Sequence, residues 1–218
     1  MLKHIKLQFL FIASLLIITS CTKDDAEEIH EHEVNKVVLH FTNTADSSTF
    51  EVKWELEHDD EGHADEDGDD HAHEGQIELE PNAEYTVEAK FYDAGEHDED
   101  SDDHDHDHDG DHEEEGEDQT PVIINEADLH HVFFEIVELS NLTIESATGD
   151  TRDSDDFPLN LKTTWKTGAE EVGEVKVYLI HDPDTKVGNT RNDFGGDDDI
   201  ETLGPGSADF KVHIGHED

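Results

Sequence analysis

Apolar and polar residues alternate along many short stretches of the chain between residues 37 and 214. A period of two is typical of β-strands that bury one face, because successive side chains point to opposite sides of the strand. No stretch has the 3.6-residue period of a long amphipathic helix. The pattern predicts nine strands, at residues 37–41, 50–56, 77–79, 85–91, 131–137, 142–146, 159–165, 172–180 and 210–214.

Nine short strands separated by turn residues predict an all-β fold. We expect an antiparallel β-sandwich, Ig-like or a partly open barrel, over residues 34–218. The chain has 218 residues, of which 32% are hydrophobic, and this is enough for one such domain. The polar residues 21–33 before it would form a tether.

The N-terminal residues 1–20 have the pattern of a signal peptide. Lys3 and Lys6 precede an apolar run of about 12 residues, which is too short to span a bilayer. The residues ITSC at 18–21 resemble the lipobox of bacterial lipoproteins. This resemblance implies that Cys21 is lipidated and becomes the mature N-terminus, so the single cysteine is not available for a disulfide or a metal.

The residues that follow the cysteine, TKDD at 22–25, resemble the signal that sends Bacteroidota lipoproteins to the outer face of the outer membrane. The resemblance implies an outer membrane lipoprotein, exposed at the cell surface or at the periplasmic face. The protein would bind the membrane through its N-terminal lipid.

The chain is strongly acidic, with 61 Asp and Glu against 13 Lys and Arg and a net charge of −48. A field of this sign repels nucleic acid and concentrates cations, so we expect no nucleic-acid partner. Two tracts, residues 57–75 and 96–118, hold 25 of the acids and 9 histidines in 42 positions, and their other residues are Gly, Ala or Ser. Because nothing there suits a core, we expect both tracts to be long disordered acidic loops.

The histidines add imidazole nitrogen, a ligand for transition metals, to tracts that would otherwise carry only carboxylates. In an extended chain, His104, His106 and His108 lie on one face, since side chains two residues apart point the same way. Imidazole suits zinc, copper or nickel, and we expect zinc first because of its availability rather than its affinity. The candidate metal ligands are His58, His63, His71, His73, His97, His104, His106, His108, His112, Asp105, Asp107 and Asp109.

Two other interpretations of the tracts stay open. Both tracts could be solubilising loops in which histidine has no role, as charge runs often are. Calcium is also possible, because Asp105, Asp107, Asp109 and Gly110 match the first half of a calcium loop. Gly116 stands where that loop needs a bidentate glutamate, so only loose calcium binding is expected.

More rigid candidates lie at the ends of predicted strands. If each connection reverses the strand direction, both tracts emerge at one end of the sandwich, together with the start of the fifth strand and the end of the eighth. His181 continues the apolar parity of its strand, and His131 does so before Phe133. The secondary metal candidates are His130, His131, His181 and Asp184, and the alternative is ordinary polar closure of a sandwich edge.

The C-terminal half resembles a group of small Bacteroidota lipoproteins that are often labelled with a type 1 periplasmic-binding-fold name. The resemblance rests on LHHVFFEI, VYLIHDPDTK, FGGDDDIE and DFKVHI between residues 129 and 214. It implies a β-rich surface or periplasmic lipoprotein that acts as an accessory to a TonB-dependent metal receptor. Positions that match the group are His181, Asp184, Lys186, Gly195, Gly196 and Asp199.

No enzyme motif is found, because the chain has no G-x-S-x-G elbow, no H-E-x-x-H helix and no phosphate-binding loop. We therefore expect a non-enzymatic, lipid-anchored extracytoplasmic protein that captures or buffers divalent transition metal. The alternative is a surface structural or interaction module with solubilising loops, stabilised by calcium at the acids of residues 150–156 and 197–199.

Overall fold

The computed structural model describes residues 34–56, 75–94, 116–188, 191–200 and 206–215. The chain divides into Met1–Glu31 and His32–Asp218, and every described residue belongs to the second unit. The predicted signal peptide, the lipidated Cys21, the tether and most of both tracts lie outside the described residues.

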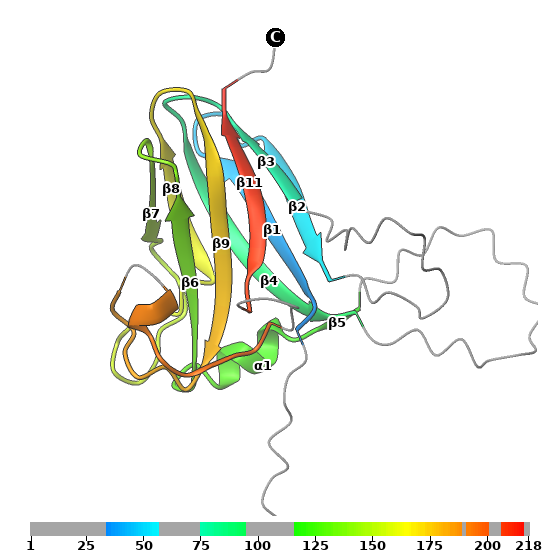
Figure 1. Ribbon diagram of the computed structural model, residues 1–218, viewed down its shortest axis with the longest axis vertical. Helices are drawn as coiled ribbons and strands as arrows, with labels where there is room; N and C mark the ends of the chain where they lie inside the picture. Colours follow the sequence, from blue (N-terminus) through cyan, green and yellow to red (C-terminus); the bar gives the residue numbers. More distant parts are fainter. Residues whose placement is uncertain (1–33, 57–74, 95–115, 189–190, 201–205, 216–218) are drawn as a thin grey trace, which may run out of the picture. The chain divides into compact units, whose positions relative to one another are not determined.

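Two β-sheets pack face to face in the described unit (Figure 1). All neighbouring strands are antiparallel except β3 and β11. The first sheet has the order β2 (Thr49–Glu55), β1 (Lys36–Asn43), β4 (Glu84–Asp93), β8 (Lys162–Thr167), β7 (Leu142–Ser146), with β5 (Glu117–Asp118) paired to the end of β4. The second has the order β6 (His130–Val137), β9 (Glu171–His181), β11 (Ala208–Ile214), β3 (Gly75–Leu79), with β10 (Asp197–Asp198) paired to the end of β9.

The predicted all-β sandwich is confirmed, and the sheets do not close into a barrel. All nine predicted strands are present, although the seventh begins at Lys162 rather than Leu159. The sequence pattern does not predict β5, β10, the 3-10 turn η1 (Arg191–Asp193) or the short helix α1 (Thr120–Asn125). The helix has a proline in its first turn and buries only Ile123. One buried residue in six gives no helical periodicity that the sequence pattern could reveal.

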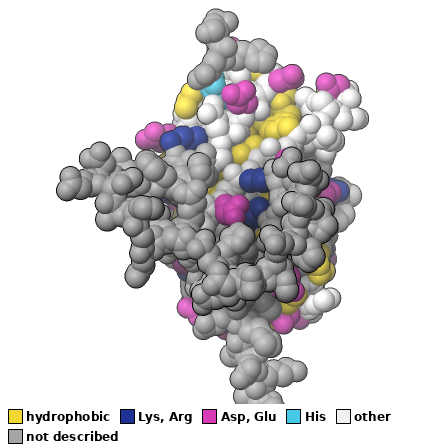
Figure 2. All heavy atoms as spheres, turned by 90° about the vertical axis from the view of Figure 1, so that its right-hand side faces the viewer, with side chains coloured by type: hydrophobic (Ala, Val, Ile, Leu, Met, Phe, Trp, Pro, Cys, Tyr) yellow, Lys and Arg dark blue, Asp and Glu magenta, His cyan; other side chains and the backbone are white. Residues whose placement is uncertain are grey.

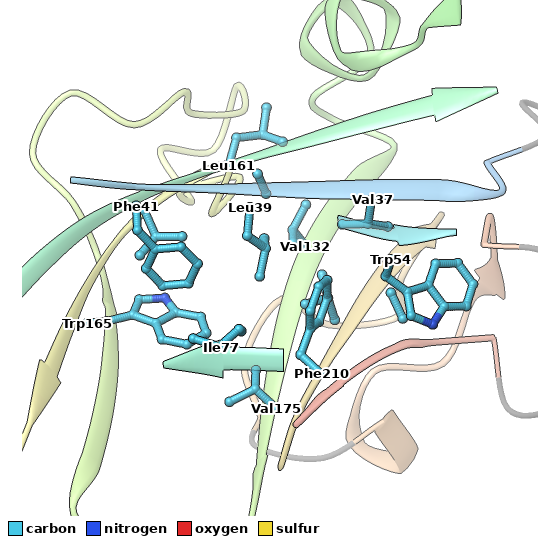
Figure 3. Packing of buried hydrophobic residues seen from close by; sticks show 14 of the residues in the cluster. Val37, Leu39, Phe41, Trp54, Ile77, Val132, Leu161, Trp165, Val175 and Phe210 are labelled. Atoms are coloured by element: carbon cyan, nitrogen blue, oxygen red, sulfur yellow. The ribbon is translucent and has the colours of Figure 1, made fainter. Parts of the chain in front are cut away.

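The core lies between the two sheets and is built from the inward-facing residues of the alternating pattern (Figure 3). Trp165 of β8 is fully buried, and its ring meets Phe41 of β1 edge to face, with ring centroids 5.3 Å apart. The indole Nε1 donates a hydrogen bond to Thr163 Oγ1 at 3.0 Å. The buried polar atom of this tryptophan therefore has a partner, as a buried N–H requires.

The boundaries predicted for the two tracts are wrong at their C-terminal ends. Gly75 belongs to β3 and is buried, and Glu117 and Asp118 form β5 against the end of β4. Glycine enters the sandwich where an acidic residue could not, because a Cβ at position 75 would lie 2.6 Å from Lys53 O and 2.7 Å from Val52 Cγ1. The missing side chain lets β3 approach β2 closely.

We expect Gly75→Ala to lower the free energy of unfolding by about 1–3 kcal/mol, because the added methyl group has to displace the backbone of β2. Chemical denaturation of the mature chain measures this loss. Gly168→Ala is the control, since a Cβ there would lie 3.2 Å from its nearest neighbour, a side-chain atom. An equal loss in the two variants would contradict the close approach of β2 and β3.

The nine predicted strands alternate in direction along the chain, even where it changes sheet, whereas the short strands β5 and β10 run in the same direction as the strands that follow them, β6 and β11. The described residues that border both tracts therefore lie at one end of the sandwich, which we call the tract end and define by Leu56, Gly75, Ala94 and Gly116 (Figure 1). The parallel pair β3 and β11 does not break the alternation, because these strands are not consecutive. The expectation of a shared end is confirmed for the described residues.

Candidate functional site

His130 and His181 lie side by side at the tract end. They are paired in register where β6 begins and β9 ends, and their ring centroids are 5.1 Å apart. His130 is fully buried, whereas His181 is partly exposed. The strand parity explains the pair, because His181 follows Leu179 on the face that packs into the core.

Oxygen atoms face both ring nitrogens of His130. The Nε2 atom lies 3.0 Å from Asp199 Oδ2, and Nδ1 lies 3.2 Å from the main-chain oxygen of Glu126. The Asp199 carboxylate and the Glu126 carbonyl thus face opposite nitrogens of the buried ring. The contact ties the segment after β10 to the start of β6, so its first effect is structural.

The sequence pattern does not predict Asp199 as a partner of His130. The two residues are far apart in the chain and meet only because β6 and β10 lie on either side of β9. The family resemblance included Asp199, but that signal did not indicate which residue it would contact.

His131 points away from His130, because adjacent residues of a strand face opposite sides. Its ring lies against Phe133, with centroids 4.2 Å apart, and Nε2 lies 3.2 Å from Asn160 Nδ2. Burial, assisted by the positive charge of Lys186, lowers the pKa of His131 to about 4. The predicted pairing of His131 with His181 is therefore wrong, since His130 takes the place beside His181, and His131 is a neutral, buried side chain near pH 7.

Asp184 lies against Gly195, in the segment that turns back after β9. Gly195 has a φ of 63°, and its missing side chain leaves room for the Asp184 carboxylate. Over residues 34–56, 75–94, 116–188, 191–200 and 206–215, no three His, Asp or Glu side chains converge closely enough to hold a metal ion. The four secondary candidates thus do not form a rigid metal centre, and among them only the rings of His130 and His181 lie side by side.

Lys186 connects three segments near His131. Its Nζ donates to the main-chain oxygen of Ala127 at 2.9 Å and to Asp153 Oδ2 at 2.7 Å. Both side chains of the ion pair are largely buried. The pair fixes the loop after β7 to the segment after β9.

We expect Lys186→Met to raise the pKa of His131 above about 4, because the substitution removes a nearby positive charge and leaves Asp153. Burial is the larger cause and persists, so the pKa stays below the ordinary value. An NMR titration of the imidazole measures the change. Lys166→Met is the control, since that lysine pairs with Glu145 on the surface, and an equal shift there would refute the role of Lys186.

Several of the acids considered for calcium already have protein partners. Asp150 accepts hydrogen bonds from the N–H groups of Asn160 and Lys162, and burial raises its pKa. Asp198 pairs with Arg191 at 2.6 Å. A calcium ion would have to replace these contacts. The positions of the two carboxylates are therefore explained by the hydrogen bonds and the ion pair within the loops.

The excess of negative charge is greatest in the tracts. On the face that includes β2 and β3, the described Asp and Glu side chains are interspersed with Lys and Arg (Figure 2). Such mixed charge is ordinary for a protein surface. The tracts, by contrast, contain 25 of the 61 acids and no Lys or Arg.

The twelve primary candidate ligands all lie outside the described residues, within 57–74 and 95–115. The described residues place only the points where these tracts join the sandwich. They also contain no helix that is long and apolar enough to cross a membrane. No family model, curated protein or solved structure matches the chain, and the resemblance to Bacteroidota lipoproteins stays a prediction.

Proposed function

We propose that this protein captures and buffers divalent transition metal, zinc first, on its two His/Asp-rich tracts. A lipid on Cys21 would anchor it at the outer membrane, facing the cell surface or the periplasm. The observation that supports the proposal most is the shared tract end. Nine imidazoles and 25 carboxylates are connected to one end of a single rigid domain, so the local concentration of ligands there is high.

The chemistry favours several exchangeable ions over one rigid cage. Ordering a tract around an ion costs roughly 1–2 kcal/mol for each residue fixed, which limits the affinity of any single site. Imidazole nitrogen selects zinc, copper or nickel over calcium, and the carboxylates add charge and oxygen ligands. Because protons compete with metal for imidazole, capture weakens as the pH falls below neutral.

The pair of His130 and His181 is not the main metal-binding site. His130 is engaged by Asp199 and by the main chain of Glu126, and a metal would have to displace these contacts. The rigid domain instead holds the two tracts together and presents them to a partner. A TonB-dependent receptor is the partner that the family resemblance suggests, and no catalytic step is proposed.

Isothermal titration with zinc, nickel and calcium tests the proposal on the mature chain. The main variant replaces the nine tract histidines by asparagine, and the control replaces His40 and His213, which lie outside the tracts. We expect saturable zinc binding in the micromolar to millimolar range, retained in the control and lost in the main variant. Zinc binding that is unchanged in the main variant would show that carboxylates alone explain it.

The second candidate function is a surface interaction module, with or without calcium, in which the tracts only keep the protein soluble. The observation that favours it is a cavity in the side of the sandwich between β6 and β7. Melting temperature measured with calcium and with zinc separates the two ions, because a bound ion stabilises the folded state.

A further inference from the structure

A cavity of about 300 Å³ opens between the edge strands β6 and β7, which belong to different sheets. Its size is at the lower end of the range of ligand pockets. Phe and Ile form half of its lining residues, and the other half includes the polar residues Glu145, Ser146 and Asn160. The lining residues that matter are Phe133, Phe134, Ile136, Ile144, Ser146 and Phe194.

On the opposite side of the sandwich, the two sheets approach each other closely. There the edge strands β2 and β3 touch, and Gly75 leaves no room even for a Cβ beside Val52 and Lys53. At the β6 and β7 side, Phe134, Ile136 and Ile144 are only partly buried although they belong to the core pattern. One side of the core is thus closed by its own strands, and the other is left open.

Both strands direct main-chain groups toward this opening. Val132 donates its N–H to Leu159 O and accepts a hydrogen bond from Asn160 Nδ2, so it faces away from β9. Because alternate residues of an antiparallel pair face the same edge, Phe134 and Ile136 face away from β9 as well.

The same rule applies to β7. Ala147 donates its N–H to Lys162 O, and Gly168 donates to Asn141 O, so odd-numbered residues face β8. Ile144 and Ser146 therefore direct their main-chain groups to the opening. A groove of mixed polarity between two such strand edges, with Phe and Ile side chains in its wall, has the recognition chemistry of β-strand addition, in which main-chain hydrogen bonds give affinity and pockets select side chains.

This chain contains no segment that suits the groove. The undescribed internal stretches 57–74 and 95–115 contain only His, Asp, Glu, Gly, Ala and Ser, and 201–205 is too short. The apolar run at residues 7–18 belongs to the predicted signal peptide and is expected to be removed when that peptide is cleaved. A second copy is opposed by the net charge of −48 on each chain, so the occupant comes from another protein of opposite charge.

We propose that the cavity between β6 and β7 is a docking site for an extended segment of a partner protein. The segment has alternating apolar residues, which enter between Phe134, Ile136 and Ile144, and flanking lysine or arginine residues. This site is independent of metal capture, since it uses none of the tract histidines and lies in the side of the sandwich rather than at its tract end.

Hydrogen exchange of the mature chain in the presence of a chelator tests the site. The probe is the peptide acetyl-Lys-Lys-Val-Thr-Ile-Thr-Val-Lys-Lys-amide, and the control peptide has proline in place of isoleucine, with the same charge. We expect the probe to slow exchange by about tenfold at the amides of Phe134 and Ile136, or of Ile144 and Ser146, and the control to have no effect. Equal protection by both peptides, protection only at β2, or no protection would overturn the proposal.

Two charge-matched variants complete the test. Ile144→Lys places a cation in the cavity, and Val172→Lys makes the same change at an exposed apolar residue outside it. We expect the first to weaken probe binding by about tenfold or more and the second to leave it unchanged. If Ile144→Lys does not fold, Ser146→Lys serves as the cavity variant instead, because Ser146 is exposed at the end of β7. Equal binding by the folded cavity variant and Val172→Lys would overturn the assignment.

Discussion

Replacing Trp165 by alanine is expected to lower the free energy of unfolding by about 3–5 kcal/mol. The indole is fully buried, meets the rings of Phe41 and Phe134 edge to face, and lies in β8, an inner strand of the first sheet. Its removal leaves a cavity between the sheets and takes away the hydrogen bond to Thr163. Because whole domains are stable by only about 5–15 kcal/mol, this variant approaches the limit of folding.

Chemical denaturation followed by the fluorescence of Trp54 measures the loss. Trp54 is the other tryptophan and is itself buried, so it reports unfolding in the variant. Val172→Ala serves as the control, since Val172 is 66% exposed and its truncation should change stability by less than about 0.5 kcal/mol. A loss below about 1 kcal/mol for Trp165→Ala would contradict the position of this side chain at the centre of the core.

The second large effect is a dependence of stability on pH that comes from His131. Burial lowers the pKa of this imidazole to about 4 in the folded protein, against the ordinary value of 6.5 in the unfolded chain. The unfolded chain therefore binds the proton more strongly. The contribution of neutral His131 is fully present above pH 6.5 and is lost as the pH falls to about 4, with a total of about 3 kcal/mol.

The comparison with His131→Gln isolates this contribution, because the many carboxylates titrate in both proteins. Glutamine keeps an acceptor for Asn160 Nδ2 but has no proton to bind in this range. The difference in unfolding free energy between wild type and variant should change by about 3 kcal/mol between pH 6.5 and pH 4. A difference that does not vary with pH would mean that His131 is charged or exposed in the folded state.

Local alternation predicts the strands of this protein well because each strand buries one face against the other sheet. Val175, Val177 and Leu179 identify β9 by themselves, and His181 continues their parity into the tract end. Alternation does not predict which strands pair across the sandwich. The parallel neighbours β3 and β11 are separated by more than a hundred residues, and nothing local specifies that contact.

The error at His131 has a similar cause. Both faces of β6 are apolar, since Val132 and Phe134 pack into the main core while Phe133 packs with Tyr178 and Phe194 in a second cluster. The pattern of β6 therefore does not indicate which face is inside. The second cluster forms only because the segment after β9 folds back over the sheet, and this contact is invisible in the sequence.

The contact between His130 and Asp199 illustrates the same limit for polar residues. Histidine and aspartate at strand ends can be recognised as candidates, but their partners depend on β10 returning beside β9. The shared end of the two tracts was predictable, because it requires only that successive strands alternate in direction. This is the feature on which the proposed metal capture rests.

The X-ray absorption spectrum of the zinc-loaded mature chain near neutral pH tests metal capture by the tracts most directly. The account predicts imidazole nitrogen among the zinc ligands, at about 2.0–2.1 Å, together with carboxylate oxygen. It also predicts that the imidazole signal disappears when the nine tract histidines are replaced by asparagine. A spectrum that shows only oxygen ligands in the unmodified chain, or an imidazole signal that survives the replacement, would contradict the account.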